Sequence, residues 1–154
     1  MEKQFEIFIK TRFFALNYIK DLTTDQLNEI PKGFNNNIIW NLAHLISTPQ
    51  AVCYLRCGLP ITIDEMTFNN YRNATAPQPF VNSHQIETFK DLLIESINTL
   101  EKDYNAGIFN NYKSWTTSTG IELVTIEDSL NFLLWHDGTH VGVIMAQKKL
   151  VTIQ

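Results

Sequence analysis

The chain has 154 residues, of which 44% are hydrophobic and 18% charged, and this composition suits one folded domain over residues 1–154 while excluding a disordered protein. Twelve Lys and Arg against sixteen Asp and Glu give a formal net charge of −4, so neither a nucleic-acid-binding surface nor a basic membrane-binding face is indicated. Charged residues interrupt the apolar ones in the N-terminal segment, which argues against a signal peptide or membrane span and favours a cytoplasmic protein. The two cysteines, Cys53 and Cys57, are too few for a disulfide framework, and we expect reduced thiols.

The first predicted helix covers residues 3–21, where apolar side chains recur at steps of three and four. They predict one buried stripe made of Phe5, Ile9, Phe13, Leu16 and Ile19. A second helix is predicted to begin at one of the asparagines 35–37, which are good N-cap residues. It continues toward Gly58, and we expect Pro49 to kink it.

A polar stretch with three prolines, residues 59–81, separates the second helix from the third. Because an extended chain spans up to about 3.3 Å per residue, this crossover is long enough to return along a whole helix, which lets helices two and three run parallel. The third helix is predicted to begin after Asn82, with Gln85 as its capping partner, and to end near Gly107.

The fourth predicted helix begins near Thr125, with Asp128 as its capping partner, and extends to about Leu150. Its central residues are apolar on nearly all sides, so we expect it to be the most buried helix. Two glycines four residues apart, Gly138 and Gly142, predict a close approach by another helix. Each apolar stripe must be covered by a neighbour, so the four segments predict an all-α fold, a four-helix bundle with a long crossover between helices 2 and 3.

Three histidines occupy these otherwise apolar helices and are the main functional signal. His136 and His140 are four residues apart, so their rings lie on one helix face about 6 Å apart along the axis, within reach of one metal ion. The alternative is a pair of core imidazoles, each satisfied by a hydrogen bond to a neighbouring helix.

The second predicted helix carries a polar stripe that includes the third histidine, His44. Its members fall at steps of three and four and none is charged: Asn37, Asn41, His44 and Thr48. A helix without charges on its outer face is unusual, so we expect this stripe to face an internal cavity rather than solvent. Three imidazoles from two helices would leave coordination positions open for water or substrate, which is typical of a catalytic metal site.

Residues 136–140 are a loose match to the metalloprotease motif H-E-x-x-H, with Asp137 in place of Glu. Three interpretations of Asp137 stay open, namely a general base, a partner that supports a ligand, and a charge on the helix surface. Ferritin-like di-iron chemistry needs two Glu-x-x-His motifs, which the sequence lacks. We predict His84 at the surface and both cysteines in the core.

Two short motifs resemble signatures of the DinB-like superfamily of metal-binding four-helix bundles. Residues 36–45 (NNIIWNLAHL) are similar to the second-helix signature, and residues 136–144 (HDGTHVGVI) are similar to the last-helix signature. The resemblance implies a divalent ion, commonly zinc or nickel, held by His44, His136 and His140. It also implies an up-down-down-up order of helices and a homodimer.

The same resemblance implies a range of activities. Some members look like transferases that place a low-molecular-weight thiol on the metal, and others are described as metal-dependent hydrolases. Our first hypothesis is therefore a metal-dependent enzyme that transfers a thiol to a small-molecule electrophile. The alternatives are a hydrolase with Asp137 as the base, and a non-catalytic bundle that binds a small ligand or a partner. Candidates for the pocket walls are the aromatic residues of the connecting segments, Tyr71, Phe80 and Trp115.

Overall fold

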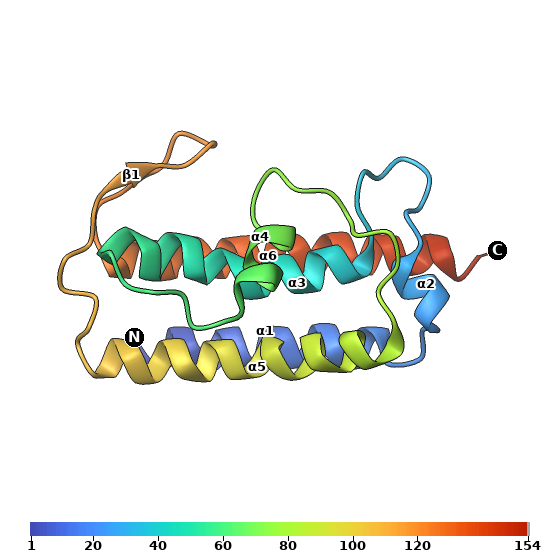
Figure 1. Cartoon of the computed structure of the whole chain (residues 1–154), viewed down its shortest axis with the longest axis horizontal. Coiled ribbons are helices and arrows are strands. Elements are labelled where there is room, and N and C mark those ends of the chain that lie inside the picture. The colour runs from blue at the N-terminus through green and yellow to red at the C-terminus, as the bar shows by residue number, and fades with distance from the viewer. Residues whose placement is uncertain (154) are drawn as a thin grey trace.

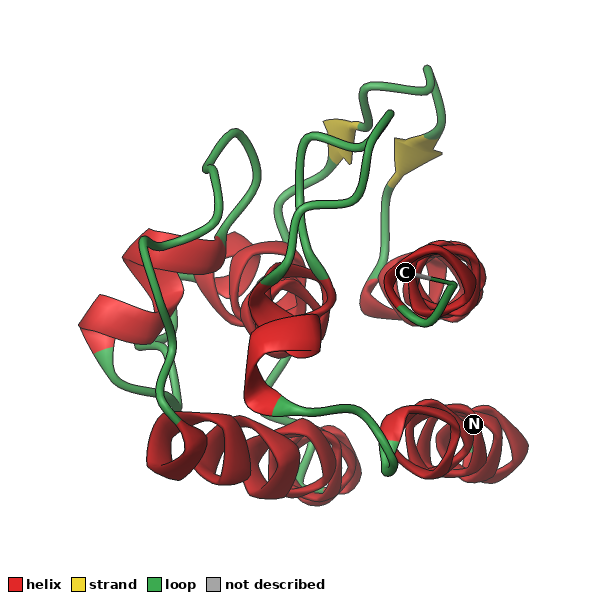
Figure 2. Ribbon diagram, turned by 90° about the vertical axis from the view of Figure 1, so that its right-hand side faces the viewer, coloured by secondary structure: helices red, strands yellow, loops and turns green. Residues whose placement is uncertain are grey.

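The computed structural model describes residues 1–153, and four long helices lie side by side in it (Figures 1 and 2). These helices are α1 (Glu2–Ile19), α3 (Ile38–Pro49), α5 (Ser83–Asn105) and α6 (Ile126–Val151). Helix α1 packs on α5 and α6, and α3 packs on the same two helices. In Figure 1, α1 and α6 run in one direction while α3 and α5 run in the other. The predicted all-α class is confirmed.

Shorter elements occupy the connections. Helix α2 (Thr24–Asn28) links α1 to α3, and helix α4 (Glu65–Tyr71) lies within the crossover and packs on α3. A small antiparallel hairpin of β1 (Trp115–Thr116) and β2 (Glu122–Leu123) precedes α6. None of these was predicted, because elements of two to seven residues are too short to show a hydrophobic period and depend on tertiary packing for their stability. Among the described residues, no helix combines the length and apolar character needed to cross a bilayer.

The long helices begin where capping chemistry predicts. The side chain of Asn37 accepts a hydrogen bond from the Trp40 amide at 2.8 Å. Reciprocal capping boxes join Asn82 to Gln85 at the start of α5 and Thr125 to Asp128 at the start of α6. These bonds satisfy amide groups that have no partner inside the helix, which is why polar residues mark the helix starts.

The second predicted helix changes its winding at Pro49 instead of ending there. After α3 the chain forms a π-helical turn, η1 (Gln50–Tyr54), and a 3₁₀ turn, η2 (Leu55–Cys57). Proline has no N–H to bond the Leu45 carbonyl and its ring crowds the preceding turn, so the regular α-helical hydrogen-bond pattern is interrupted at this position. The segment stops at Gly58, whose φ of +71° suits a glycine at a helix C-terminus.

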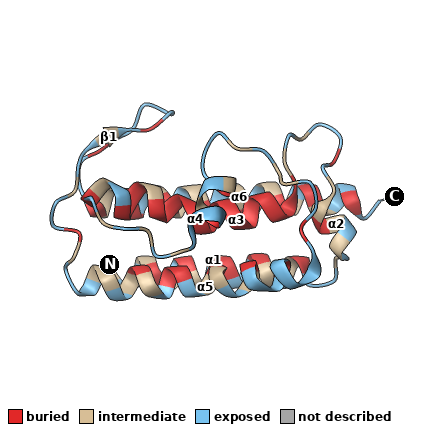
Figure 3. Ribbon diagram, in the orientation of Figure 1, coloured by how far each residue is buried: buried red, intermediate tan, exposed pale blue. Residues whose placement is uncertain are grey.

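Two predictions about burial are wrong. The inward stripe of α1 consists of Phe5, Phe8, Arg12, Ala15 and Ile19, and the side chain of Phe13 is 54% exposed. The most buried helix is α3 rather than α6, since all residues of α3 are buried. The crossover and α4 cover the outer side of α3, whereas α6 keeps an exposed face (Figure 3). On that face an added methyl group at Gly138 or Gly142 would have no neighbour within 4 Å, so neither glycine serves a close approach by another helix of this chain.

The apolar core is divided into two clusters with a polar layer between them. One cluster surrounds Leu42 and Leu93, and the other surrounds Phe8 and Leu133. On α1 the fully buried Arg12 lies between Phe8 of one cluster and Ile19 of the other. Its side chain reaches residues of α3, α5 and α6. Sequence patterning missed this layer, because a basic residue on an apolar helix normally faces solvent.

Candidate metal centre

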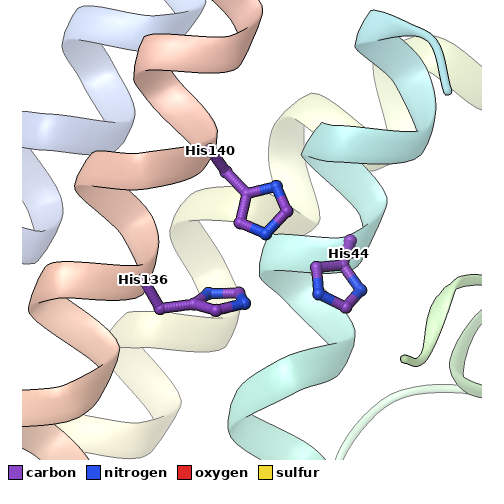
Figure 4. Close-up of side chains that lie close together, drawn as sticks. All are labelled: His44, His136 and His140. Atoms are coloured by element: carbon purple, nitrogen blue, oxygen red, sulfur yellow. The ribbon is translucent and has the colours of Figure 1, made fainter. Parts of the chain in front are cut away.

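Three histidine rings from two helices point toward one another in Figure 4. His44 comes from α3, and His136 and His140 come from successive turns of α6. Each ring offers one nitrogen to the centre, and these three nitrogens lie within 4.8 Å of one another, so the group can hold a metal ion. The ring centroids of His136 and His140 are 4.4 Å apart, and that of His44 is 4.8 Å from His140. The tertiary structure thus brings together the three residues selected from the sequence.

Backbone and side-chain carbonyl oxygens fix two of the rings. The Nδ1 of His44 lies 2.7 Å from the carbonyl oxygen of Tyr71, and the Nδ1 of His140 lies 2.7 Å from the Oδ1 of Asn41. A carbonyl oxygen can only accept, so each Nδ1 carries the proton and each Nε2 keeps its lone pair. Such outer hydrogen bonds are the usual means of orienting a metal-binding histidine.

The orientation of the Asn41 amide is itself determined by its neighbours. Its Nδ2, which carries two hydrogens, lies within hydrogen-bond distance of three acceptors: Asn36 Oδ1 at 3.1 Å, the Asn37 carbonyl at 2.8 Å and Gln147 Oε1 at 3.1 Å. With three acceptors around the nitrogen, the oxygen must face His140. The predicted polar stripe on this helix is buried along its whole length, and this network explains why it lacks charge.

The ring of His136 has no such support. Its Nδ1 is buried and, among the described residues, is the only buried side-chain nitrogen or oxygen without a hydrogen-bond partner. An unsatisfied buried polar atom costs about 1–3 kcal/mol, so His136 does not behave as a satisfied core imidazole. The three ring nitrogens that lie within 4.8 Å of one another are a donor set that suits a divalent ion, so the residues present fit a bound ion.

Burial also sets the protonation of the cluster. Loss of hydration lowers the pKa of His44. Burial, followed by repulsion from the neighbouring imidazoles, lowers the pKa of His136 to about 2, and the same effects lower the pKa of His140 to about 4. All three rings are therefore neutral near pH 7, which is the form that binds divalent metals.

A cavity of about 240 Å³ opens beside the cluster, and His44 and His136 form part of its wall. Trp115, predicted as a wall residue, lines it, together with Phe132 of α6. Tyr71 is 3% exposed and contributes its carbonyl to His44 rather than its ring to the wall, and the side chain of Phe80 is 56% exposed to solvent.

Thr48, a member of the stripe predicted to face an internal cavity, also lines it. Sequence reasoning did not select the remaining polar wall residues, which come mainly from short elements and loops. They are Ser47, Arg56, Arg72, Asn73, Thr117 and Ser118.

Asp137 lies away from this cavity wall. Its side chain is fully buried, and its Oδ2 accepts a hydrogen bond from Arg12 Nε at 2.8 Å. Burial raises the pKa of Asp137, and the guanidinium of Arg12 opposes that shift. The interpretation of Asp137 as a charge on the helix surface is therefore wrong. The other predicted locations are confirmed, since His84 is exposed and Cys53 and Cys57 are buried.

The fold and the histidine cluster place this chain in the class of helical proteins with a candidate three-histidine metal centre. The chain belongs to the DinB superfamily, whose family model matches residues 9–144. This match covers most of the chain, includes both motifs and confirms the resemblance. No curated protein matches the chain significantly.

Proposed function

We propose that this protein is a divalent-metal-dependent enzyme that joins a low-molecular-weight thiol to a small electrophile, with zinc or nickel held by His44, His136 and His140. The convergence of three neutral imidazoles within 4.8 Å supports this proposal. Three neutral ligands leave the full positive charge of a divalent ion uncompensated, so the ion would favour an anionic sulfur and would keep a thiol deprotonated near pH 7.

The protein residues have two tasks in such a reaction. Tyr71 and Asn41 keep the lone pairs of His44 and His140 directed at the centre, while the aromatic wall of Trp115 and Phe132 shields part of the cavity from water. The S–H bond of the thiol breaks and its proton leaves to solvent in the open cavity. The sulfur then forms a carbon–sulfur bond at the electrophile, while the bond from that carbon to its leaving group breaks and the leaving group departs as an anion with the bonding electrons. No general base from the chain is required.

The location of Asp137 argues against the hydrolase in which this residue is the base. Such a base would have to lie near the reacting water, and Asp137 is the residue that the sequence offers for that role. Its carboxylate is bound by Arg12 in the polar layer of the core, and Asp137 is not part of the cavity wall. We therefore assign Asp137 to the support of the bundle rather than to proton transfer.

Metal binding and thiol consumption test the proposal. Zn²⁺ and Ni²⁺ would be titrated by calorimetry into untagged protein, with His136→Ala as the test variant and His84→Ala as the matched control, because His84 is an exposed histidine outside the cluster. We expect one ion per chain for wild type and His84→Ala, and loss of binding in His136→Ala. Thiol-dependent loss of a chlorodinitrobenzene substrate should likewise occur with wild type and His84→Ala and be lost with His136→Ala.

Two results would contradict this function. Metal binding in His136→Ala equal to that of the control would remove the three-histidine centre. Stoichiometric metal without thiol-dependent turnover would favour the non-catalytic bundle.

Three further expectations are part of the proposal: the order of the helices, a homodimer and a cytoplasmic location. The helix directions in Figure 1 support an up-down-down-up four-helix bundle. A homodimer in the cytoplasm would be tested by light scattering of the purified protein and by cell fractionation.

A further inference from the structure

The cavity beside the histidine cluster has a charge opposite to that of the chain. Arg56 and Arg72 both line it, and among the residues that the structure describes no Asp or Glu belongs to its wall. The chain as a whole carries a formal charge of −4. A concave site lined by one sign of charge concentrates ligands of the opposite sign, so this cavity is suited to an anion.

Neither guanidinium is committed to a protein carboxylate. The ion pairs within residues 1–153 involve other cations: Lys3, Lys10, Arg12, Lys90 and Lys148. Arg12 shows what a structural arginine looks like in this protein, since it is fully buried and bound to Asp137. Arg56 and Arg72 keep their planar sets of N–H donors available, and these match the geometry of carboxylate and phosphate groups.

Arg56 is held in place by the hairpin that precedes α6. Its Cζ atom lies 4.7 Å from the ring centroid of Trp115, and its carbonyl oxygen accepts a hydrogen bond from the Lys113 amide at 2.9 Å. The indole N–H of Trp115 in turn donates to the hydroxyl of Tyr112 at 2.9 Å. Stacking on a ring face leaves the in-plane donors of a guanidinium free. Trp115 therefore positions Arg56 and leaves its N–H groups available for a ligand.

Arg72 approaches the histidines from a different element. It caps the C-terminus of α4 and directly follows Tyr71, whose carbonyl oxygen holds His44. The cavity therefore has one guanidinium beside the hairpin and another beside the α4 terminus, with His44 and His136 in the same wall.

An apolar surface extends from Arg56 to the cluster. The ring centroids of Trp115 and Phe132 are 6.2 Å apart, and those of Phe132 and His136 are 5.9 Å apart. Val52 adds an aliphatic contact. With a volume of about 240 Å³, the cavity is smaller than the roughly 300–1,000 Å³ typical of drug-sized ligands, and it suits a small molecule with an apolar body.

We infer that the substrate of this site is a small organic anion, whose carboxylate or phosphate contacts Arg56 and Arg72 while its apolar part packs on Trp115 and Phe132. This inference rests on the proposed function insofar as it treats the cavity as the substrate site. The two guanidiniums bind and orient the substrate and are not catalytic residues.

Binding of matched probes to metal-free protein tests the inference separately from the metal. The probes are 3-phenylpropionate, phenyl phosphate and the neutral 3-phenylpropionamide. Binding of each probe is measured from the change in the NMR shift of the Trp115 indole N–H. The chelator used to remove metal must be dialysed away, because it is itself a polycarboxylate. We expect at least one of the two anions to bind about ten-fold more tightly than the amide, and their relative affinities distinguish a carboxylate from a phosphate substrate.

Charge-removing variants locate the contact. Arg56→Gln and Arg72→Gln should each weaken binding of the preferred anion about ten-fold, whereas Lys113→Gln removes an exposed neighbouring charge outside the wall and should leave it unchanged. In wild type, affinity should fall as NaCl is raised, a measurement that depends on no variant.

Three results would overturn the inference: equal binding of both anions and the amide, equal behaviour of the arginine variants and Lys113→Gln, or affinity independent of salt. Anion binding by a protein that binds no metal would instead overturn the proposed enzyme and leave the anion site intact.

Discussion

Replacing Arg12 with Met should destabilise the protein by several kcal/mol, because this side chain joins the four long helices. It lies on α1 and is fully buried. Its Nε donates to Asp137 of α6 at 2.8 Å, its Nη1 donates to the Leu93 carbonyl of α5 at 2.8 Å, and its Nη2 donates to the Leu45 carbonyl of α3 at 2.7 Å. Methionine fills similar space and provides none of these donors.

The expected cost has two sources. Removing one member of a buried ion pair typically costs about 3–5 kcal/mol, because the other charge stays buried without compensation. The Leu45 carbonyl also loses its donor, and Pro49 cannot replace it because the residue four positions on in the helix has no N–H, which adds about 1–3 kcal/mol. Against a typical unfolding free energy of about 5–15 kcal/mol, Arg12→Met should lose a large share of the stability.

Urea denaturation followed by circular dichroism measures this loss. The exposed pair of Lys10 with Glu6 supplies the control, since Lys10→Met should cost less than about 1 kcal/mol. The double variant Arg12→Met/Asp137→Leu should recover most of the stability, because it leaves no unpaired buried charge. The loss in Arg12→Met should also be smaller at pH 5 than at pH 8, since an Asp137 without its guanidinium takes up a proton more readily.

A cost below about 1 kcal/mol for Arg12→Met would refute this reasoning, as would a double variant less stable than the sum of the two single changes.

Three further predictions concern the histidines and α6. Burial keeps the folded pKa of His136 at about 2 and that of His140 at about 4, below the ordinary value of 6.5. Below about pH 6.5 the unfolded chain therefore takes up protons that the folded chain does not. Metal-free protein should keep its full stability above that pH and lose about 1.4 kcal/mol per histidine for each pH unit below it. Urea midpoints across pH 7 to 4 would check this, and a His136→Asn/His140→Asn variant should show a flatter profile. Gly138→Ala should raise the melting temperature by the equivalent of about 0.5–1 kcal/mol, since the added methyl group meets nothing within 4 Å; a lower melting temperature would reveal a partner on this face. Thr125→Ala should cost about 1 kcal/mol by removing the cap of α6, and no change in calorimetric stability would contradict that role.

Local signals predicted the parts of the fold that depend on neighbouring residues. The caps at Asn82 and Thr125 are set by side chains that bond within three residues, so their positions could be taken from the sequence. The same holds for the polar stripe of α3, whose lack of charge indicated an internal location. The inward face of α1 could not be predicted in this way, because Arg12 is tolerated there only by acceptors on other helices.

The candidate site shows the same division. The spacing of His136 and His140 places two rings on one face of any helix, so this half of the cluster needed no tertiary information. The choice between a satisfied pair and a ligand set did need it, since it depends on which polar atoms find partners. Only the folded chain brings His44 beside them and leaves the Nδ1 of His136 without a hydrogen bond.

Local sequence patterns specified the helix starts, the all-α class and the three histidines that converge, because each depends on contacts within about one helical turn or on a recognisable motif. Tertiary structure alone decided that Asp137 pairs with Arg12, that α3 is the covered helix, and that Arg56 and Arg72 share a cavity wall. These features join residues far apart in the chain. Their energies depend on burial and on partners that no local pattern specifies.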